Sequence, residues 1–261
     1  MVTPAPGPQA PARARFDGPP GAVAVSHLSV YDWPAADGLC GGTPHLHLTC
    51  TEGYVVTGGS GAVQTLTTSG FTSTPLTPGA LVWFSPGTIH RLVNDGGLRI
   101  SVLMQNSGLP EAGDAVLTLP PRFLTDRATY EAAVALPPPT EEDACAEAAR
   151  ARRDLALEGF AALRTASESG DPGPLAAFHR SAAALVQPLL DDWEQRWHAG
   201  AEAAAAATGE QIARLRAGDS SHLAEARVTA RHTDPVRRFG MCGRLDVYDN
   251  GRPDLRPAPE D

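Results

Sequence analysis

Between residues 21 and 119, short apolar runs alternate again and again with turn residues, and this pattern restricts the fold more than any other feature. Runs of this length, rich in β-branched residues and with few helix signals, predict an all-β sandwich or barrel. The predicted strands cover residues 22–31, 44–50, 53–57, 62–67, 80–84, 89–93, 98–105 and 115–119.

Glycine and proline separate these predicted strands. The glycine-rich segments at residues 58–61 and 94–97 can adopt positive φ at little steric cost, so we expect two hairpin connections there. Pro78-Gly79 and Pro86-Gly87 predict tight turns, because proline fixes one φ angle and glycine frees the next.

The composition changes sharply after Pro137-Pro138-Pro139, where the chain becomes rich in Ala, Arg, Glu and Leu. This change divides the chain into a predicted β-barrel over 21–136 and a predicted helical C-terminal region over 137–261. The first twenty residues are rich in Pro and Ala and predict a disordered leader over 1–20. Within that region we expect helices at 140–167, from residue 174 onward with a bend at Pro188, and at 201–217, with a short final strand at 244–248.

The second of these helices carries an apolar stripe with three- and four-residue spacing. Such a stripe packs on the barrel, in a small bundle or across a two-fold axis, so a homodimer is one of the expected arrangements. The stripe consists of Leu175, Phe178, Ala182, Leu185, Val186, Leu189, Trp193 and Trp197.

The charge of the chain limits its partners. With 21 basic and 30 acidic residues the net charge is −9, which argues against nucleic acid and anionic membrane surfaces. No apolar run is long enough to span a bilayer. The four cysteines are widely spaced, which favours a reducing compartment, and we expect a cytoplasmic protein with a small-molecule substrate.

Three imidazoles and one carboxylate fall within two of the predicted strand regions. His45 and His47 are two residues apart, so their side chains leave the same face of a strand. Glu52 follows a short segment that can turn it toward the same point, and His90 has to arrive from a neighbouring strand. These are ligands that suit a first-row divalent metal, and we predict that the four residues bind one.

The pattern resembles the cupin superfamily, which has two sequence motifs. The first is a glycine followed by His-x-His, a glutamate and a second glycine. The second is a glycine followed by Pro-x-Gly, a histidine and an asparagine. The resemblance covers about residues 22–119 and implies an antiparallel jelly-roll barrel with the metal in its mouth. Two departures lie in predicted loops: the leading glycine is displaced, and proline directly precedes glycine in the second motif. The matching residues are His45, His47, Glu52, Gly59, Gly79, Pro86, Gly87, His90 and Asn94.

Strand parity suggests what surrounds the ligands. If Glu52 faces inward, so does Tyr54, which we assign as the catalytic residue that supplies a proton or a hydrogen bond. The remaining histidines are assigned structural or surface roles. Further wall residues are expected from Trp83, Phe84, Met104 and Gln105.

The predicted function is that of a metal-dependent cupin enzyme, most simply a dioxygenase-type oxidoreductase that acts on a small organic molecule. A metal-dependent isomerase or lyase and a non-catalytic cupin that binds a small ligand are the alternatives. Iron is the favoured ion, and Mn, Ni, Zn and Cu suit the same ligands.

Overall fold

The computed structural model describes residues 16–248, so most of the predicted leader at 1–20 lies outside the described residues. Nine strands in this range form one antiparallel sheet with the order β4-β3-β6-β1-β9-β8; β2 pairs with β6 and β7, and β5 pairs with β3. The strands are β1 (Ala24–Val30), β2 (His45–His47), β3 (Glu52–Thr67), β4 (Gly70–Leu76), β5 (Leu81–Phe84), β6 (Ile89–Met104), β7 (Ala115–Leu117), β8 (Arg238–Phe239) and β9 (Gly243–Val247).

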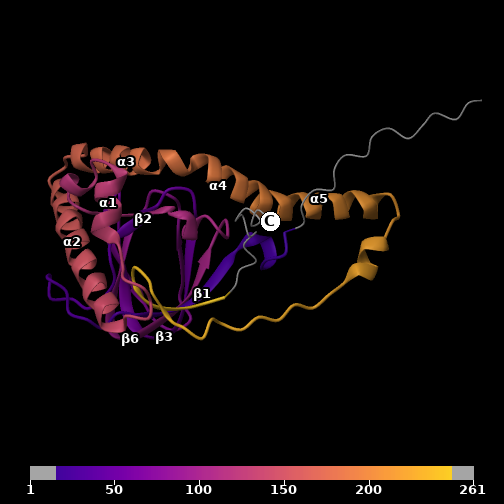
Figure 1. The fold of residues 1–261 in the computed structure, drawn as a ribbon, viewed down its shortest axis with the longest axis horizontal. Helices are drawn as coiled ribbons and strands as arrows, with labels where there is room; N and C mark the ends of the chain where they lie inside the picture. Colours follow the sequence, from indigo (N-terminus) through magenta and orange to yellow (C-terminus); the bar gives the residue numbers. More distant parts are fainter. Residues whose placement is uncertain (1–15, 249–261) are drawn as a thin grey trace, which may run out of the picture.

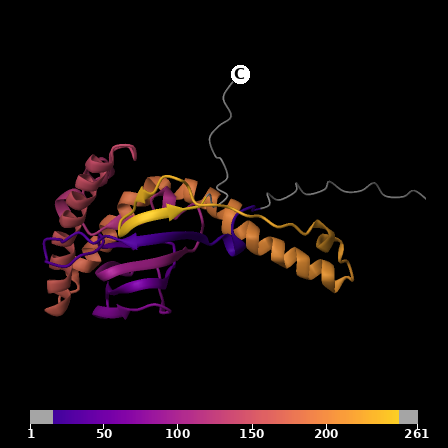
Figure 2. The same cartoon turned by 90° about the horizontal axis from the view of Figure 1, so that it is seen from below.

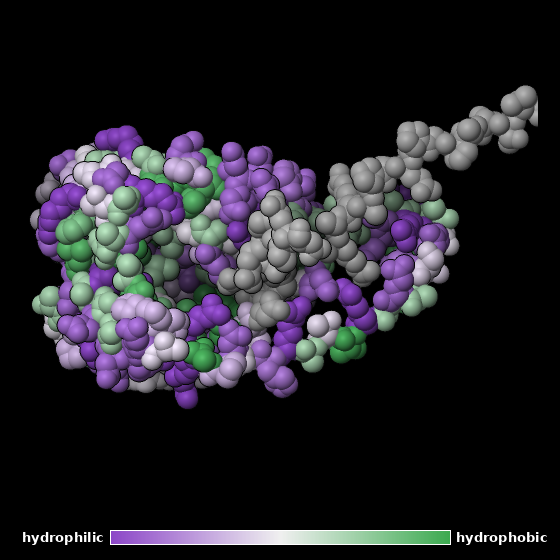
Figure 3. All heavy atoms as spheres, in the orientation of Figure 1, coloured by the Kyte–Doolittle hydropathy of each residue, from purple (hydrophilic) through white to green (hydrophobic). Residues whose placement is uncertain are grey.

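The predicted mainly-β fold with a C-terminal helical region is confirmed, and the ladder of described strands curves without closing on itself (Figure 1). The space-filling view shows a hollow between the helical layer and the sheet (Figure 3). The longer helices are α1 (Arg127–Val134), α2 (Glu142–Glu168), α3 (Gly173–Val186), α4 (Leu190–Trp197) and α5 (Ala203–Arg216).

Two long strands form the centre of the sheet and correct the two hairpin predictions. β3 and β6 each run through sixteen residues, and their pairing continues past both glycine-rich segments with register shifts between Val56 and Gly61. A Cβ on Gly59 would lie 2.1 Å from the carbonyl oxygen of Gly97. The glycines therefore permit a close approach of two backbones at a bulge, where the sequence pattern had indicated chain reversals.

β4 and α1 are among the elements that were not predicted from the sequence. β4 is polar and contains Pro75, which an edge strand tolerates because its outer N–H groups need no partner in the ladder. α1 is a short helix that begins after Asp126, whose side chain accepts a hydrogen bond from the N–H of Thr129. Neither element carries a strong apolar period, so the sequence pattern gave little sign of them.

The helices extend the hydrophobic core of the sheet. Leu175, Phe178, Leu185 and Trp193 of the apolar stripe are buried in the same cluster as the strand residues, whereas Trp197 is 41% exposed. Around Pro188 a 3-10 turn, Gln187–Leu189, separates α3 from α4. Helix α5 extends away from the body in both ribbon views and buries none of its residues (Figures 1 and 2). No described helix is both long enough and apolar enough to cross a membrane.

Helix α2 docks on the chain just after β7 through a very close contact. A Cβ on Gly159 would lie 2.0 Å from the carbonyl oxygen of Thr118, so only glycine allows this approach. The hydroxyl of Thr118 donates a hydrogen bond of 2.9 Å to the carbonyl oxygen of Ala156 in the same helix. This contact fixes the distance between the helical layer and the strands.

We predict that Gly159→Ala destabilises the protein by about 1–3 kcal/mol, because overpacking against a backbone carbonyl outweighs the gain of about 1 kcal/mol in helix propensity. Gly209→Ala is the matched control, because Gly209 lies in α5 with no atom within 4 Å of an added Cβ. Urea denaturation measures both variants. A Gly159→Ala protein as stable as the wild type would contradict the close contact.

Candidate metal centre

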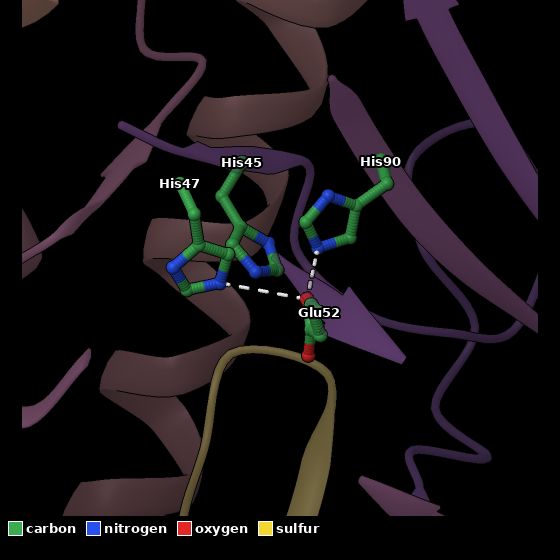
Figure 4. A group of neighbouring side chains, drawn as sticks. All are labelled: His45, His47, Glu52 and His90. Carbon is green, nitrogen blue, oxygen red and sulfur yellow. Dashed lines mark ion pairs between the residues drawn. The ribbon is translucent and has the colours of Figure 1, made fainter. Parts of the chain in front are cut away.

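The strands of the sheet bring the four predicted ligand residues to one place. His45 in β2 is paired directly opposite His90 in β6, and Glu52 opens β3, which also pairs with β6. His47 follows two residues after His45, on the same face of β2. All four side chains are buried, and Figure 4 shows the three rings grouped around the carboxylate of Glu52.

The ligand-type atoms of these residues lie within 4.8 Å of one another. The Nε2 atoms of His90 and His47 lie 2.9 Å and 3.5 Å from Oε2 of Glu52. The rings of His45 and His90 are also close, with centroids 4.2 Å apart. This spacing is short enough for four side chains to contact a single ion.

A hydrogen bond at Nδ1 orients each imidazole. The carbonyl oxygens of Thr43 and Thr88 lie 2.8 Å and 3.1 Å from Nδ1 of His45 and His90. A carbonyl only accepts, so both Nδ1 atoms carry the proton and both Nε2 atoms present a lone pair to the cluster. Hydrogen bonds from the second ring nitrogen to a carbonyl oxygen orient histidine ligands in metal sites.

Asp114 performs the same task for His47. Its Oδ2 lies 3.1 Å from Nδ1 of His47, and its carboxylate also accepts hydrogen bonds from the N–H and hydroxyl of Thr49 and the N–H of Cys50. Burial raises the pKa of Asp114, but the bonds from His47 and Thr49 outweigh it and lower the pKa below its usual value. Sequence reasoning missed Asp114, because nothing in the spacing links it to His47, 67 residues earlier.

The arrangement leaves two buried acceptors facing each other. Nε2 of His90 and Oε2 of Glu52 have no hydrogen-bond partner among the described residues, although they are 2.9 Å apart. With the proton on Nδ1, both atoms present lone pairs and repel each other unless a cation or a second proton lies between them. The residues therefore fit a divalent metal ion.

The electrostatics of the metal-free cluster agree with this interpretation. Burial raises the pKa of Glu52, but the neighbouring His90 and His47 hold it well below its usual range. Burial lowers the pKa of His47, but Asp114 and Glu52 outweigh it and raise the pKa to about 9. Burial also lowers the pKa of His45 well below its usual value. A proton thus occupies the cluster at neutral pH where a metal ion fits.

A cavity of about 230 Å³ lies beside the four residues, and most of its lining is apolar. Tyr54 lines it and is buried, as parity predicted, and burial next to the charge of Glu52 raises the pKa of this phenol well above its usual value. Met104 also lines the cavity, but Trp83 is 67% exposed and Gln105 is exposed, so those two wall predictions are wrong.

The C-terminal segment supplies a part of the wall that the sequence did not predict. Met241, Cys242 and Leu245 line the cavity because β9 pairs with β1 and carries this segment across the sheet. Two charged residues, Glu111 and Arg238, line it as well. The cavity is therefore built from both ends of the described chain.

No family model matches this chain, and no curated protein matches it. Among solved structures, it is similar to Streptomyces Pac13, described as a nucleoside dehydratase (TM-score 0.28, 14% identity, 36% of this chain and 66% of that one). A Klebsiella pneumoniae protein with a double-stranded β-helix domain (0.26, 17%, 33% and 67%) and an oxalate oxidase in complex with glycolate (0.23, 22%, 33% and 50%) are further matches. None of these matches shows what this chain binds.

The antiparallel sheet and the buried cluster of three histidines and one glutamate agree with the fold and the ligand set that the sequence resemblance to cupins implies. The chain thus combines a curved antiparallel sheet with a candidate metal centre. The motif residue Asn94 has a structural role, since its side chain donates to the carbonyl of Val30 and accepts from the N–H groups of Gly96 and Leu98.

We predict that Asp114→Asn weakens metal binding by about 10- to 100-fold, because an amide can turn its NH₂ group toward Nδ1 of His47 and move the imidazole proton to Nε2. Competition with a chromophoric zinc chelator measures the affinity. Thr49→Val is the control, since it removes one donor to Asp114 and leaves the bond to His47 in place. Equal affinities of Asp114→Asn and the wild type would contradict the positioning role.

Metal binding should also release a proton. His47 has a pKa of about 9 without metal, so it is charged at pH 7 and has to lose its proton to become a ligand. We expect about one proton per ion at pH 7 and an apparent affinity that rises about tenfold per pH unit until about pH 9. Titration in weakly buffered solution measures the release. A flat affinity between pH 7 and 9 would contradict it.

Proposed function

We propose that this chain is a metal-dependent enzyme that acts on a small organic molecule, most simply as a dioxygenase-type oxidoreductase. One observation carries the proposal: three Nε2 atoms and one carboxylate oxygen converge beside a mostly apolar cavity. Three neutral imidazoles and one carboxylate suit iron, manganese, nickel, zinc or copper, and iron is the favoured ion because it also activates dioxygen.

The proposal assigns a separate role to each of the residues around the candidate metal centre. His45, His47 and His90 would hold the ion, and Glu52 would hold it while neutralising one of its two charges. A bound ion would supply Lewis acidity and, in the case of iron, the electrons for oxygen chemistry. Because burial keeps the phenol of Tyr54 protonated, this residue would donate a hydrogen bond to the substrate.

The apolar wall favours an oxygenase over acid–base chemistry. Val102, Met104 and Leu28 exclude water from one side of the cavity, which suits a reactive oxygen intermediate. A specific observation favours a second candidate, a metal-dependent isomerase or lyase, because such an enzyme needs a general base. Glu111 lines the same cavity and, among the residues that the structure describes, is the one carboxylate there besides Glu52.

Metal analysis of untagged protein tests the first step of the proposal. We expect about one ion per chain in the wild type and little in His90→Gln, since one ligand is lost. His27→Gln is the matched control, because His27 is exposed and bonds to Ser101 and Tyr248, away from the cluster. Equal metal contents in all three proteins would contradict the metal site.

Oxygen-electrode measurements with catechols, thiols and keto acids test the reaction. We expect oxygen uptake that depends on added iron and falls at least about 100-fold in His90→Gln. Turnover without oxygen uptake, lost in Glu111→Gln, would support the isomerase or lyase instead. Tight binding of a small molecule without turnover would identify a ligand-binding protein and contradict an enzyme.

A further inference from the structure

A second and larger cavity lies on the other side of the wall around the candidate metal centre. It has a volume of about 530 Å³ and is bounded by β7, α1, α2, the end of α3 and the turn between β8 and β9. Pro110, Glu111, Met241 and Leu245 line both cavities, so the two spaces are separated by a thin layer of side chains. Of the four candidate metal ligands, His45, His47 and Glu52 line the first cavity, and none of the four lines the second.

Arg152 is the unusual residue in this second cavity. Its guanidinium donates to the carbonyl oxygens of Gly240 at 2.9 Å and Val134 at 3.4 Å, while its buried Nε has no partner among the described residues. Two other buried arginines of the described chain have carboxylate partners: Arg91 pairs with Asp37, and Arg153 pairs with Asp154.

Within residues 16–248, no carboxylate forms an ion pair with Arg152, and burial lowers its pKa below the usual value. Arg152 is partly buried, and a cation withdrawn from water without a counterion costs free energy, which an anion that enters from solution would reduce. The uncommitted N–H groups of the guanidinium are suited to a carboxylate, which they can bind in a planar, bidentate way.

Tyr130 adds a second donor beside Arg152. Its hydroxyl oxygen accepts a hydrogen bond of 3.0 Å from the N–H of Leu117, and its own proton has no acceptor among the described residues. The two side chains are close enough for each to shift the pKa of the other. Donors thus converge in this part of the cavity without a matching acceptor.

The other lining residues restrict the anion. Glu131 forms an ion pair with Arg127 at 2.5 Å, so these two residues together add little net charge to the cavity. Glu111 also lies on the shared wall, and its carboxylate accepts a hydrogen bond from the N–H of Gly108. Much of the remaining lining is apolar and includes Val134, Leu185 and Phe239. A single negative charge on a small apolar body fits this environment.

We propose that this second cavity binds a small organic monocarboxylate, whose carboxylate contacts Arg152 and Tyr130 and whose apolar part lies against Val134, Leu185 and Phe239. The site is separate from the candidate metal centre and needs no metal. It therefore stands independently of the proposed function.

Calorimetric titration of the full-length protein tests this site. The protein is first freed of metal with a chelator, so that a carboxylate cannot bind through an ion. The probes are isovalerate and its neutral counterpart isovaleramide, with inorganic phosphate as a dianionic comparison. We expect isovalerate to bind and the other two to bind at least about tenfold more weakly, because isovaleramide has no charge to offer the guanidinium and phosphate has no apolar part to bury against the cavity wall.

Three variants locate the site. We expect Arg152→Gln to weaken isovalerate binding at least about tenfold and Tyr130→Phe to weaken it severalfold, since each removes a donor. Arg122→Gln is the control, because Arg122 is exposed and pairs with Glu158. If circular dichroism shows that Arg152→Gln does not fold, Tyr130→Phe decides, because it keeps the bonds of Arg152 to Val134 and Gly240.

The proposal is overturned if isovaleramide binds as well as isovalerate, if both donor variants bind like the wild type, or if the wild type shows no saturable binding at millimolar concentration. Binding that requires added metal also overturns it, since the carboxylate then occupies the metal cavity. If the protein binds isovalerate as expected but the metal analysis shows no site-dependent ion, the proposed metal-dependent enzyme is contradicted and the proposed carboxylate site is not.

Discussion

The repulsion between two buried lone pairs, on Nε2 of His90 and on the carboxylate of Glu52, is the constraint on which the candidate site depends. The sheet brings these atoms together, because β6 carries His90 and pairs with both β2 and β3, and Glu52 opens β3; the two atoms lie 2.9 Å apart. The bond from His90 to the carbonyl of Thr88 then prevents the ring from relieving it with a proton at Nε2 alone. A positive charge is the remaining way to stabilise the arrangement.

The ligands could be predicted from the sequence because their geometry is largely local. His45 and His47 share a strand face by parity, and Glu52 and His90 fall in recognisable turn-to-strand contexts. Asp114 could not be predicted in this way. Its role depends on the pairing of β2 with β7, which brings residues far apart in the sequence into contact. Local pattern thus identifies the metal ligands, while tertiary pairing selects the residues that orient them.

The two wrong hairpin predictions have a common physical cause. Glycine relieves steric restriction both in a hairpin turn and where two backbones approach closely, so Gly59 gives the same sequence signal in either case. The helices were predicted well because the spacing of Leu175, Phe178 and Trp193 is unambiguous. The sequence left open what this apolar stripe packs against. The structure shows that these three residues are buried in the same hydrophobic core as the strand residues. Whether two chains associate remains a prediction.

The contribution of the C-terminal segment to the metal cavity has a consequence for biosynthesis. Met241 and Cys242 lie about 150 residues after His90, so at typical elongation rates they leave the ribosome roughly 10 to 30 s later. During this interval the nascent chain already contains every ligand while the cavity still lacks one wall. Ions in the surrounding solution can therefore reach the histidines most easily before translation is finished.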